Sequence, residues 1–94
     1  MNKNTNNKND RYYRTSSFYT ACFLYAKKQI LVNVDKLTDP RRAQFVLLDS
    51  PELEILLHQY NYAKENTADV LVDARMFVTA IKQLKDKLYQ EESV

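Results

Sequence analysis

The sequence predicts an α+β domain in which a small antiparallel sheet, built from a central β-hairpin and one or two short strands, packs with three helices in the order (β)αββα(β)α. Two apolar runs with strand-like alternation flank a Thr-Asp-Pro-Arg-Arg turn, which indicates the hairpin. Two later segments space their apolar residues three and four apart, which indicates amphipathic helices. A chain of 94 residues fits one such domain.

The polar ends of the chain fall outside the predicted domain. Residues 1–10 have no apolar residue after Met1, so they bury too little surface to offset their chain entropy. We expect a disordered tail at 1–10, a single domain at 11–90 and a frayed C-terminus at 91–94. The start of the chain is too polar for a signal peptide, and no apolar run approaches the ~20 residues of a membrane span. A cytoplasmic protein is therefore expected.

The first structured segment opens with a pair of aromatic residues. Tyr12 and Tyr13 indicate a short strand, and the Thr-Ser-Ser run that follows supplies helix N-caps. From Phe18 to Lys28, apolar residues recur at helical spacing, which predicts a short helix. Cys22 is the single cysteine of the chain, and its apolar neighbours favour a buried small hydrophobe over a reactive thiol.

The predicted hairpin has one strand on each side of Pro40. Ile30, Val32 and Val34 alternate along the first strand, with Leu31 facing the other way. Pro40 sets the backbone angle of the second turn position. The second strand contains Phe-Val-Leu-Leu and is apolar on both faces, which predicts a central strand that is covered at least partly on each side.

Two further helices are predicted in the second half of the chain. Ser50 is a favourable N-cap, and Pro51 suits the first helical position after it. Asp73 caps the last helix. Between them, residues 70–72 form either a very short strand or an extended entry to the last helix. The apolar stripes of the two helices are Leu53, Leu56, Leu57 and Tyr60 in the first, and Phe77, Ile81, Leu84 and Leu88 in the second.

Three stretches of the sequence carry a family resemblance. They read YYRTSSFYTACFL, FVLLDSPELEILLHQY and VDARMFVTAIKQLKDKLY. Together they resemble, over residues 12–90, a family of short bacterial and phage-type proteins known only as a domain of unknown function. The resemblance implies the architecture described above and a setting on mobile elements. It implies no activity.

Charge is unevenly distributed, although the formal net charge is only +2. Residues 1–28 balance to +5 and residues 51–74 to −4. Such asymmetry can steer a charged partner toward one part of the surface. Basic side chains contact phosphates and aromatic side chains stack on bases. Both kinds occur together at residues 11–14, and basic residues also cluster in the hairpin turn and on the last helix. The candidates for nucleic acid binding are Arg11, Tyr12, Arg14, Arg41, Arg42, Lys82 and Lys85.

Each of these candidates also has an ordinary structural explanation. One tyrosine of the first pair can pack on the sheet while the arginines lie in solvent. Charged residues are common in turns, and the polar face of a core helix in a near-neutral protein carries lysines in any case. The sequence therefore leaves open whether the last helix contacts nucleic acid or only packs on the core.

No catalytic, metal or cofactor site is predicted. His58 is the only histidine, and Glu54, four residues earlier, could contact it on the same helix face. Because such a pair is common by chance, we interpret His58 as a surface residue. The acidic residues between 52 and 73 are partly explained by helix starts and do not converge on a catalytic pair. Glycine is absent, which excludes Gly-rich phosphate loops. No small-molecule substrate is evident.

Two classes of function therefore remain. The first is a small non-catalytic nucleic-acid-binding accessory or regulatory protein of a phage or mobile element, with DNA or RNA as its partner. The second is a protein-interaction module that pairs with itself as a homodimer, or that acts as an adaptor or inhibitor of a host or phage enzyme. The basic segments favour the first class, which we predict. The seven tyrosines and the acidic helix support the second class as the alternative. An enzyme is not expected.

Overall fold

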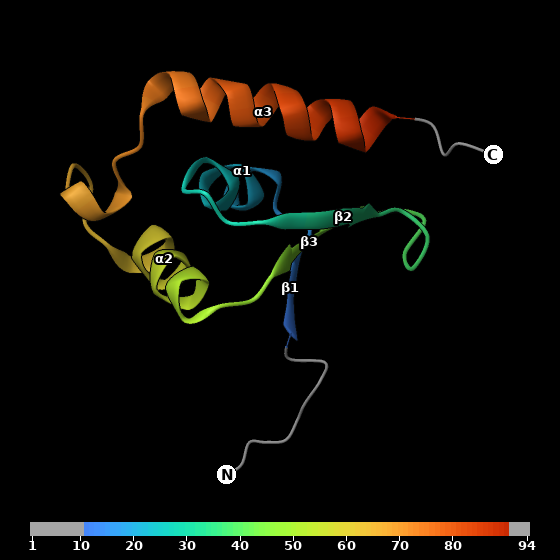
Figure 1. The fold of residues 1–94 in the computed structure, drawn as a ribbon, viewed down its shortest axis with the longest axis horizontal. Coiled ribbons are helices and arrows are strands. Elements are labelled where there is room, and N and C mark those ends of the chain that lie inside the picture. The colour runs from blue at the N-terminus through green and yellow to red at the C-terminus, as the bar shows by residue number, and fades with distance from the viewer. Residues whose placement is uncertain (1–10, 91–94) are drawn as a thin grey trace, which may run out of the picture.

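The computed structural model describes residues 11–90. The predictions of a disordered tail and of a frayed C-terminus lie outside these residues. Within residues 11–90 no helix is long and apolar enough to cross a membrane. The elements, shown in Figure 1, are β1 (Tyr12–Thr15), α1 (Phe18–Ala26), β2 (Leu31–Asp35), β3 (Gln44–Leu48), α2 (Pro51–Tyr62), the short 3₁₀ helix η3 (Ala68–Val70) and α3 (Ala74–Tyr89).

The three strands form one antiparallel sheet in the order β1-β3-β2. β3 pairs with β1 on one side and with β2 on the other. β1 and β2 therefore run parallel to each other, joined through α1, with β3 inserted between them as in a split βαβ unit. This confirms the α+β class, the β2–β3 hairpin and the central position of β3.

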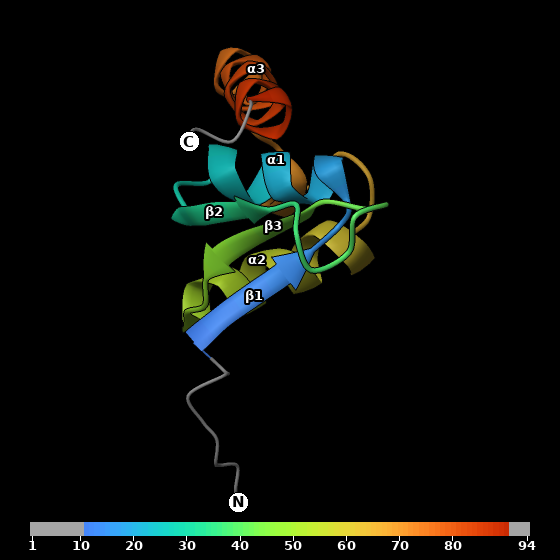
Figure 2. The same ribbon diagram turned by 90° about the vertical axis from the view of Figure 1, so that its right-hand side faces the viewer.

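The helices are arranged around α1. Figures 1 and 2 show α1 between the sheet and α3, with α2 beside it. The hydroxyl of Tyr25 in α1 donates a hydrogen bond of 2.8 Å to Oε1 of Gln83 in α3. A helix enclosed on several sides is apolar around its circumference rather than along one stripe. The buried residues of α1 are Thr20, Ala21, Cys22, Phe23, Leu24 and Ala26.

The predicted start of each helix is confirmed by the contacts of its N-cap. The Ser17 side chain accepts from the backbone N–H of Thr20, and the Ser50 side chain accepts from that of Leu53. Oδ1 of Asp73 accepts from the N–H groups of Arg75 and Met76 at 2.8 and 3.0 Å. Each cap satisfies backbone donors that have no partner inside the helix.

The β2–β3 turn also has the predicted chemistry. Pro40 occupies its second position, and the N–H of Arg42 donates to the carbonyl of Asp39 at 3.1 Å. Oδ1 of Asp39 accepts from the N–H of Arg41 at 3.0 Å. The two arginines therefore project from a turn whose backbone is held by its own hydrogen bonds.

One local prediction was wrong. The register of β2 shifts between Leu31 and Asn33. Val34 therefore lies with Leu31 on the face that packs on the core, and not on the same face as Val32 as predicted. An extra residue in one strand reverses the side on which the following side chains lie. Of the two alternatives predicted for residues 70–72, the extended entry is confirmed, because the chain leaves the 3₁₀ turn η3 at Val70 and continues in an extended conformation into α3.

Candidate interaction surfaces

The two faces of the sheet have different surroundings. One packs against α1, and we name the opposite one the open face. In Figure 2, which looks toward the three strands, the helices lie behind and above them. No helix covers this face, and yet several of its exposed side chains are apolar: Tyr12 is 43% exposed, Val32 47%, Leu48 40% and the neighbouring Ile30 59%. An antiparallel sheet with one solvated face normally alternates apolar and polar residues, so this face departs from the usual pattern.

Three of these side chains form a row across the strands. Tyr12 in β1 pairs with Leu48 in β3. The N–H of Leu48 donates to the carbonyl of Ile30 at 2.9 Å, which continues the row to the β2 side. We name Tyr12, Leu48 and Ile30 the apolar row. Val32, the extra residue of the bulge, lies next to it along β2.

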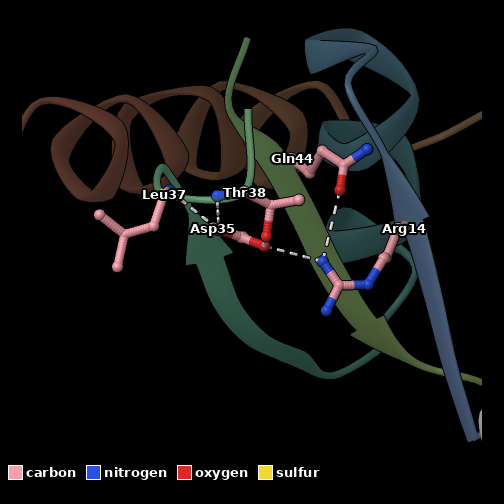
Figure 3. A network of polar contacts seen from close by, with 5 residues as sticks. All are labelled: Arg14, Asp35, Leu37, Thr38 and Gln44. Atoms are coloured by element: carbon pink, nitrogen blue, oxygen red, sulfur yellow. Dashed lines mark hydrogen bonds and ion pairs between the residues drawn. The ribbon is translucent and has the colours of Figure 1, made fainter. Parts of the chain in front are cut away.

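A polar network crosses the other end of the open face. Nη1 of Arg14 in β1 donates to Oδ2 of Asp35 in β2 at 3.0 Å and to Oε1 of Gln44 in β3 at 3.3 Å (Figure 3). Because β3 lies between β1 and β2, the Arg14 side chain spans the full width of the sheet. Among residues 11–90 this is the only ion pair.

The course of Arg14 explains why one residue of the open face is buried. Val46 lies on this face directly opposite Arg14 and is nevertheless only 3% exposed. An arginine that reaches from one edge strand to the other lays its methylene groups over the strand between them. Arg14, predicted as a nucleic acid contact, therefore has a structural role as a cover for Val46.

Asp35 is held in its charged form by four hydrogen bonds. Its carboxylate accepts from the Thr38 hydroxyl at 2.6 Å, from the N–H groups of Thr38 and Leu37, and from Arg14. These bonds, with the Thr38 hydroxyl first, lower the pKa of Asp35 well below its usual range. The same carboxylate thus begins the β2–β3 turn and anchors Arg14.

The remaining basic candidates lie on the β2–β3 turn and on α3. Figure 1 shows that this turn lies at the same end of the molecule as the C-terminus of α3. Nζ of Lys36, at the start of the turn, donates to the backbone carbonyls of Leu88 and Gln90 and so joins the two segments. Such a contact satisfies carbonyls that a helix C-terminus leaves without partners, and it places positive charge at the negative end of the helix dipole.

The structure does not bring all seven candidates into one site. Arg11 directly precedes β1, Tyr12 and Arg14 belong to it, and Tyr12 is part of the apolar row. Arg41, Arg42, Lys82 and Lys85 are exposed on the turn and on α3, and none of the four forms an ion pair within residues 11–90. On α3, Lys82 and Lys85 lie outside the stripe that contacts the core. The helix therefore packs on the core, and contact of its lysines with nucleic acid stays a prediction.

Sequence reasoning missed the exposed residues of the open face. Ile30, Val32 and Leu48 have the β-branched or apolar character of core residues, and nothing local marks them as exposed. The available signal was the apolar character of both faces of β3, because a small sheet has only enough helices to cover one of them. The partners of Arg14 were also missed.

The two reactive residue types take no part in these surfaces. His58 is exposed on α2, with its ring centroid 4.9 Å from that of Tyr62. Cys22 is completely buried in α1, and this burial raises the pKa of its thiol to about 11. Within the part of the chain that the structure describes, no group of His, Cys, Asp and Glu residues is arranged to hold a metal ion.

Comparison with known proteins identifies the family of the chain. Residues 10–90 match the model of the family described as "Domain of unknown function (DUF5659)", and the chain belongs to that family. The resemblance drawn from the sequence to a domain of unknown function is thereby confirmed, whereas the bacterial or phage setting stays a prediction. A search of curated proteins and a search of solved structures found no match.

Proposed function

We propose that the protein is a non-catalytic binding protein and that it contacts nucleic acid through its basic end. Membership of the family implies no activity, so we argue the proposal from the surface of the structure. The basic end comprises the β2–β3 turn with Arg41 and Arg42 and the exposed side of α3 with Lys82 and Lys85. The observation that carries the proposal is the contact of Lys36 with the last carbonyls of α3, which holds these two segments at one end of the molecule.

The chemistry of the basic end fits phosphate groups. Arginine presents several donors in a planar fork that matches phosphate geometry, and lysine adds a mobile point charge. Arg41 and Arg42 are exposed and unpaired within residues 11–90, so contact with a phosphate breaks no ion pair of the fold. Arg14 is left out of the footprint, because its guanidinium is already bonded to Asp35 and Gln44.

Fluorescence anisotropy with labelled single- and double-stranded DNA and RNA tests this proposal. Between about 50 and 200 mM salt we expect the affinity to fall as counterions return to the phosphates. The double substitution Arg41→Gln/Arg42→Gln removes two such contacts. We expect it to weaken binding at every salt concentration and to reduce the slope of log affinity against log salt by roughly 1.4–1.8.

The matched control removes the same charge from the other end of the molecule. Lys64→Gln/Arg75→Gln alters the second residue after α2 and the first turn of α3, and both segments lie far from the β2–β3 turn in Figure 1. We expect this variant to keep the wild-type slope. Equal losses in both variants would reduce the effect to net charge, and the absence of binding by the wild type at low salt would end the proposal.

A second candidate function is protein interaction, and the open face favours it. The exposed apolar side chains there are contiguous rather than scattered, and contiguous apolar surface bordered by polar residues is typical of protein-binding sites. The Arg14–Asp35 pair supplies such a border. The charges of this pair cancel, so the open face suits an apolar protein surface better than a phosphate backbone.

Affinity capture with three immobilised proteins tests this second candidate. Wild type is compared with Leu48→Lys, which places a charge in the apolar row, and with Ile55→Lys, which changes an equally apolar exposed residue of α2. We expect a protein, identified by mass spectrometry and then bound again in purified form, that wild type and Ile55→Lys retain and Leu48→Lys loses. Retention of every captured protein by Leu48→Lys would contradict the candidate.

A further inference from the structure

We propose that the occupant of the open face is a second copy of this chain, packed face to face. The two copies are related by a two-fold axis that lies between the two sheets, runs parallel to β3 and passes next to Leu48. This inference rests on the second candidate function, the use of the open face for protein interaction. It would make the protein a homodimer whose two sheets form a sandwich with the apolar rows at its centre.

The apolar row is complementary to itself. Leu48 lies at its middle, with the aromatic Tyr12 on one side and the β-branched Ile30 on the other. A two-fold axis along β3 places Leu48 against Leu48 of the partner subunit and Tyr12 against Ile30 of the partner subunit. Each aromatic ring then meets an aliphatic side chain, and the larger residue of one row meets the smaller residue of the other. This arrangement needs no residue outside the row.

The charges of the open face do not oppose such pairing. Arg14 and Asp35 are bonded to each other, so this end of the face carries no net charge. A copy that meets this face therefore encounters a polar border of balanced charge rather than like charges, which is the usual composition of an interface rim.

The area of the face sets the strength expected of the dimer. With about 200 Å² for a large apolar side chain, four side chains that are 40–59% exposed leave on the order of 400 Å² of apolar surface per copy. Two copies bury on the order of 800 Å², below the roughly 1,200–2,000 Å² of stable complexes. The dimer should therefore be weak and dependent on concentration, with no permanent association at low protein concentration.

Sedimentation and light scattering of the purified full chain between about 10 μM and 1 mM test the inference. We expect the wild-type mass to rise with concentration from 11.1 kDa toward twice that value. Leu48→Lys and Leu48→Glu should each remain monomeric, because the axis brings two like charges together. An equimolar mixture of the two should associate again as a heterodimer, since only a residue at a two-fold axis meets itself.

Two controls separate association from folding. Thermal unfolding of each Leu48 variant establishes that it is folded. If a Leu48 variant does not fold, Tyr12→Ser repeats the test of association at the end of the apolar row. As the control on α2, Ile55→Lys and Ile55→Glu, measured separately and as a mixture, should show the same dependence of mass on concentration as the wild type.

Three results would overturn the inference. They are a wild type that stays monomeric at about 1 mM, a dimer that is unaffected by changes at Leu48 and Tyr12, and folded Leu48 variants that fail to associate when mixed. If the wild type is monomeric but a captured partner is still lost by Leu48→Lys, the inference fails and the second candidate function stands. If neither effect is observed, both fail.

Discussion

The two faces of the sheet are built by the same three strands and yet have different roles. On the covered face, Phe45 and Leu47 are buried against α1 and belong to the main core. On the open face, Leu48 and Val32 are about half exposed, and only Val46 is buried, beneath Arg14. One face is covered by a helix, whereas the other is covered in part by a single charged side chain.

This difference teaches that stability and recognition can be separated within one strand. Full burial of a large apolar side chain contributes about 1.5–3 kcal/mol, whereas a side chain that stays half exposed contributes much less. Residues 47 and 48 are neighbours in β3, but only the first is needed to hold α1 on the sheet. The open face can therefore be changed in experiments without loss of the fold, which makes its variants informative.

The largest contrast between a covered and an open position should appear in thiol labelling. Cys22 is completely buried in α1, whereas a thiol introduced by Val32→Cys lies on the open face. Because Cys22 reacts only when the domain opens, we expect its labelling near pH 8 to be at least about 10³-fold slower than that of the thiol at position 32. The rates are measured by mass spectrometry with a maleimide.

The control for this labelling is denaturation. In concentrated urea the two thiols should react at similar rates, because neither is then protected. Comparable rates in native buffer would mean that α1 is accessible without unfolding, and the separation of the two faces would lose its basis.

The next contrast concerns stability. Phe45→Ala removes a buried ring from beneath α1, and we expect a loss of about 3–5 kcal/mol in the free energy of unfolding. Leu48→Ala removes an apolar side chain of the same strand from the open face, and we expect a loss of about 1 kcal/mol or less. Urea unfolding followed by circular dichroism gives both values. Similar losses would show that the open face also contributes substantially to the folded state.

The covered face was largely predictable from the sequence. The turn at Pro40, the caps Ser50 and Asp73, and the central position of β3 all follow from local residue chemistry and apolar periodicity. Helix starts depend on residues within one turn, so their signal is present in a short stretch of sequence. The apolar stripe of α3 was predictable for the same reason.

The open face was not predictable, because it depends on contacts between distant residues. The bulge at Val32 decides whether Ile30 and Val32 or Leu31 and Val34 meet the core, and both pairs are apolar. Arg14 and Asp35 are 21 residues apart, and a pattern of local charges cannot show that they meet. Basic residues could be counted in the sequence, but the pairing of Arg14 and the association of the β2–β3 turn with the end of α3 required the fold.

The smallest contrast concerns acid stability at the polar end of the open face. The pKa of Asp35 is lowered in the folded state, so its contribution to stability is present above its unfolded value, about 3.9, and is lost as the pH falls through the folded value. The free energy of unfolding should therefore fall with pH below about 4 in the wild type and fall less steeply in Asp35→Asn. Urea unfolding from neutral pH down to about pH 2 measures both, and Asp69→Asn on η3 serves as an exposed acidic control.

The causes of this shift can be ranked by two further variants. The Thr38 hydroxyl contributes more to the lowered pKa of Asp35 than Arg14 does, so Thr38→Val should flatten the acid profile more than Arg14→Met. Methionine keeps a flexible apolar stem over Val46, which limits the effect of Arg14→Met to the lost charge. The opposite order would mean that Arg14, rather than the β2–β3 turn, holds Asp35 in place, and the polar border of the open face would then depend on the ion pair alone.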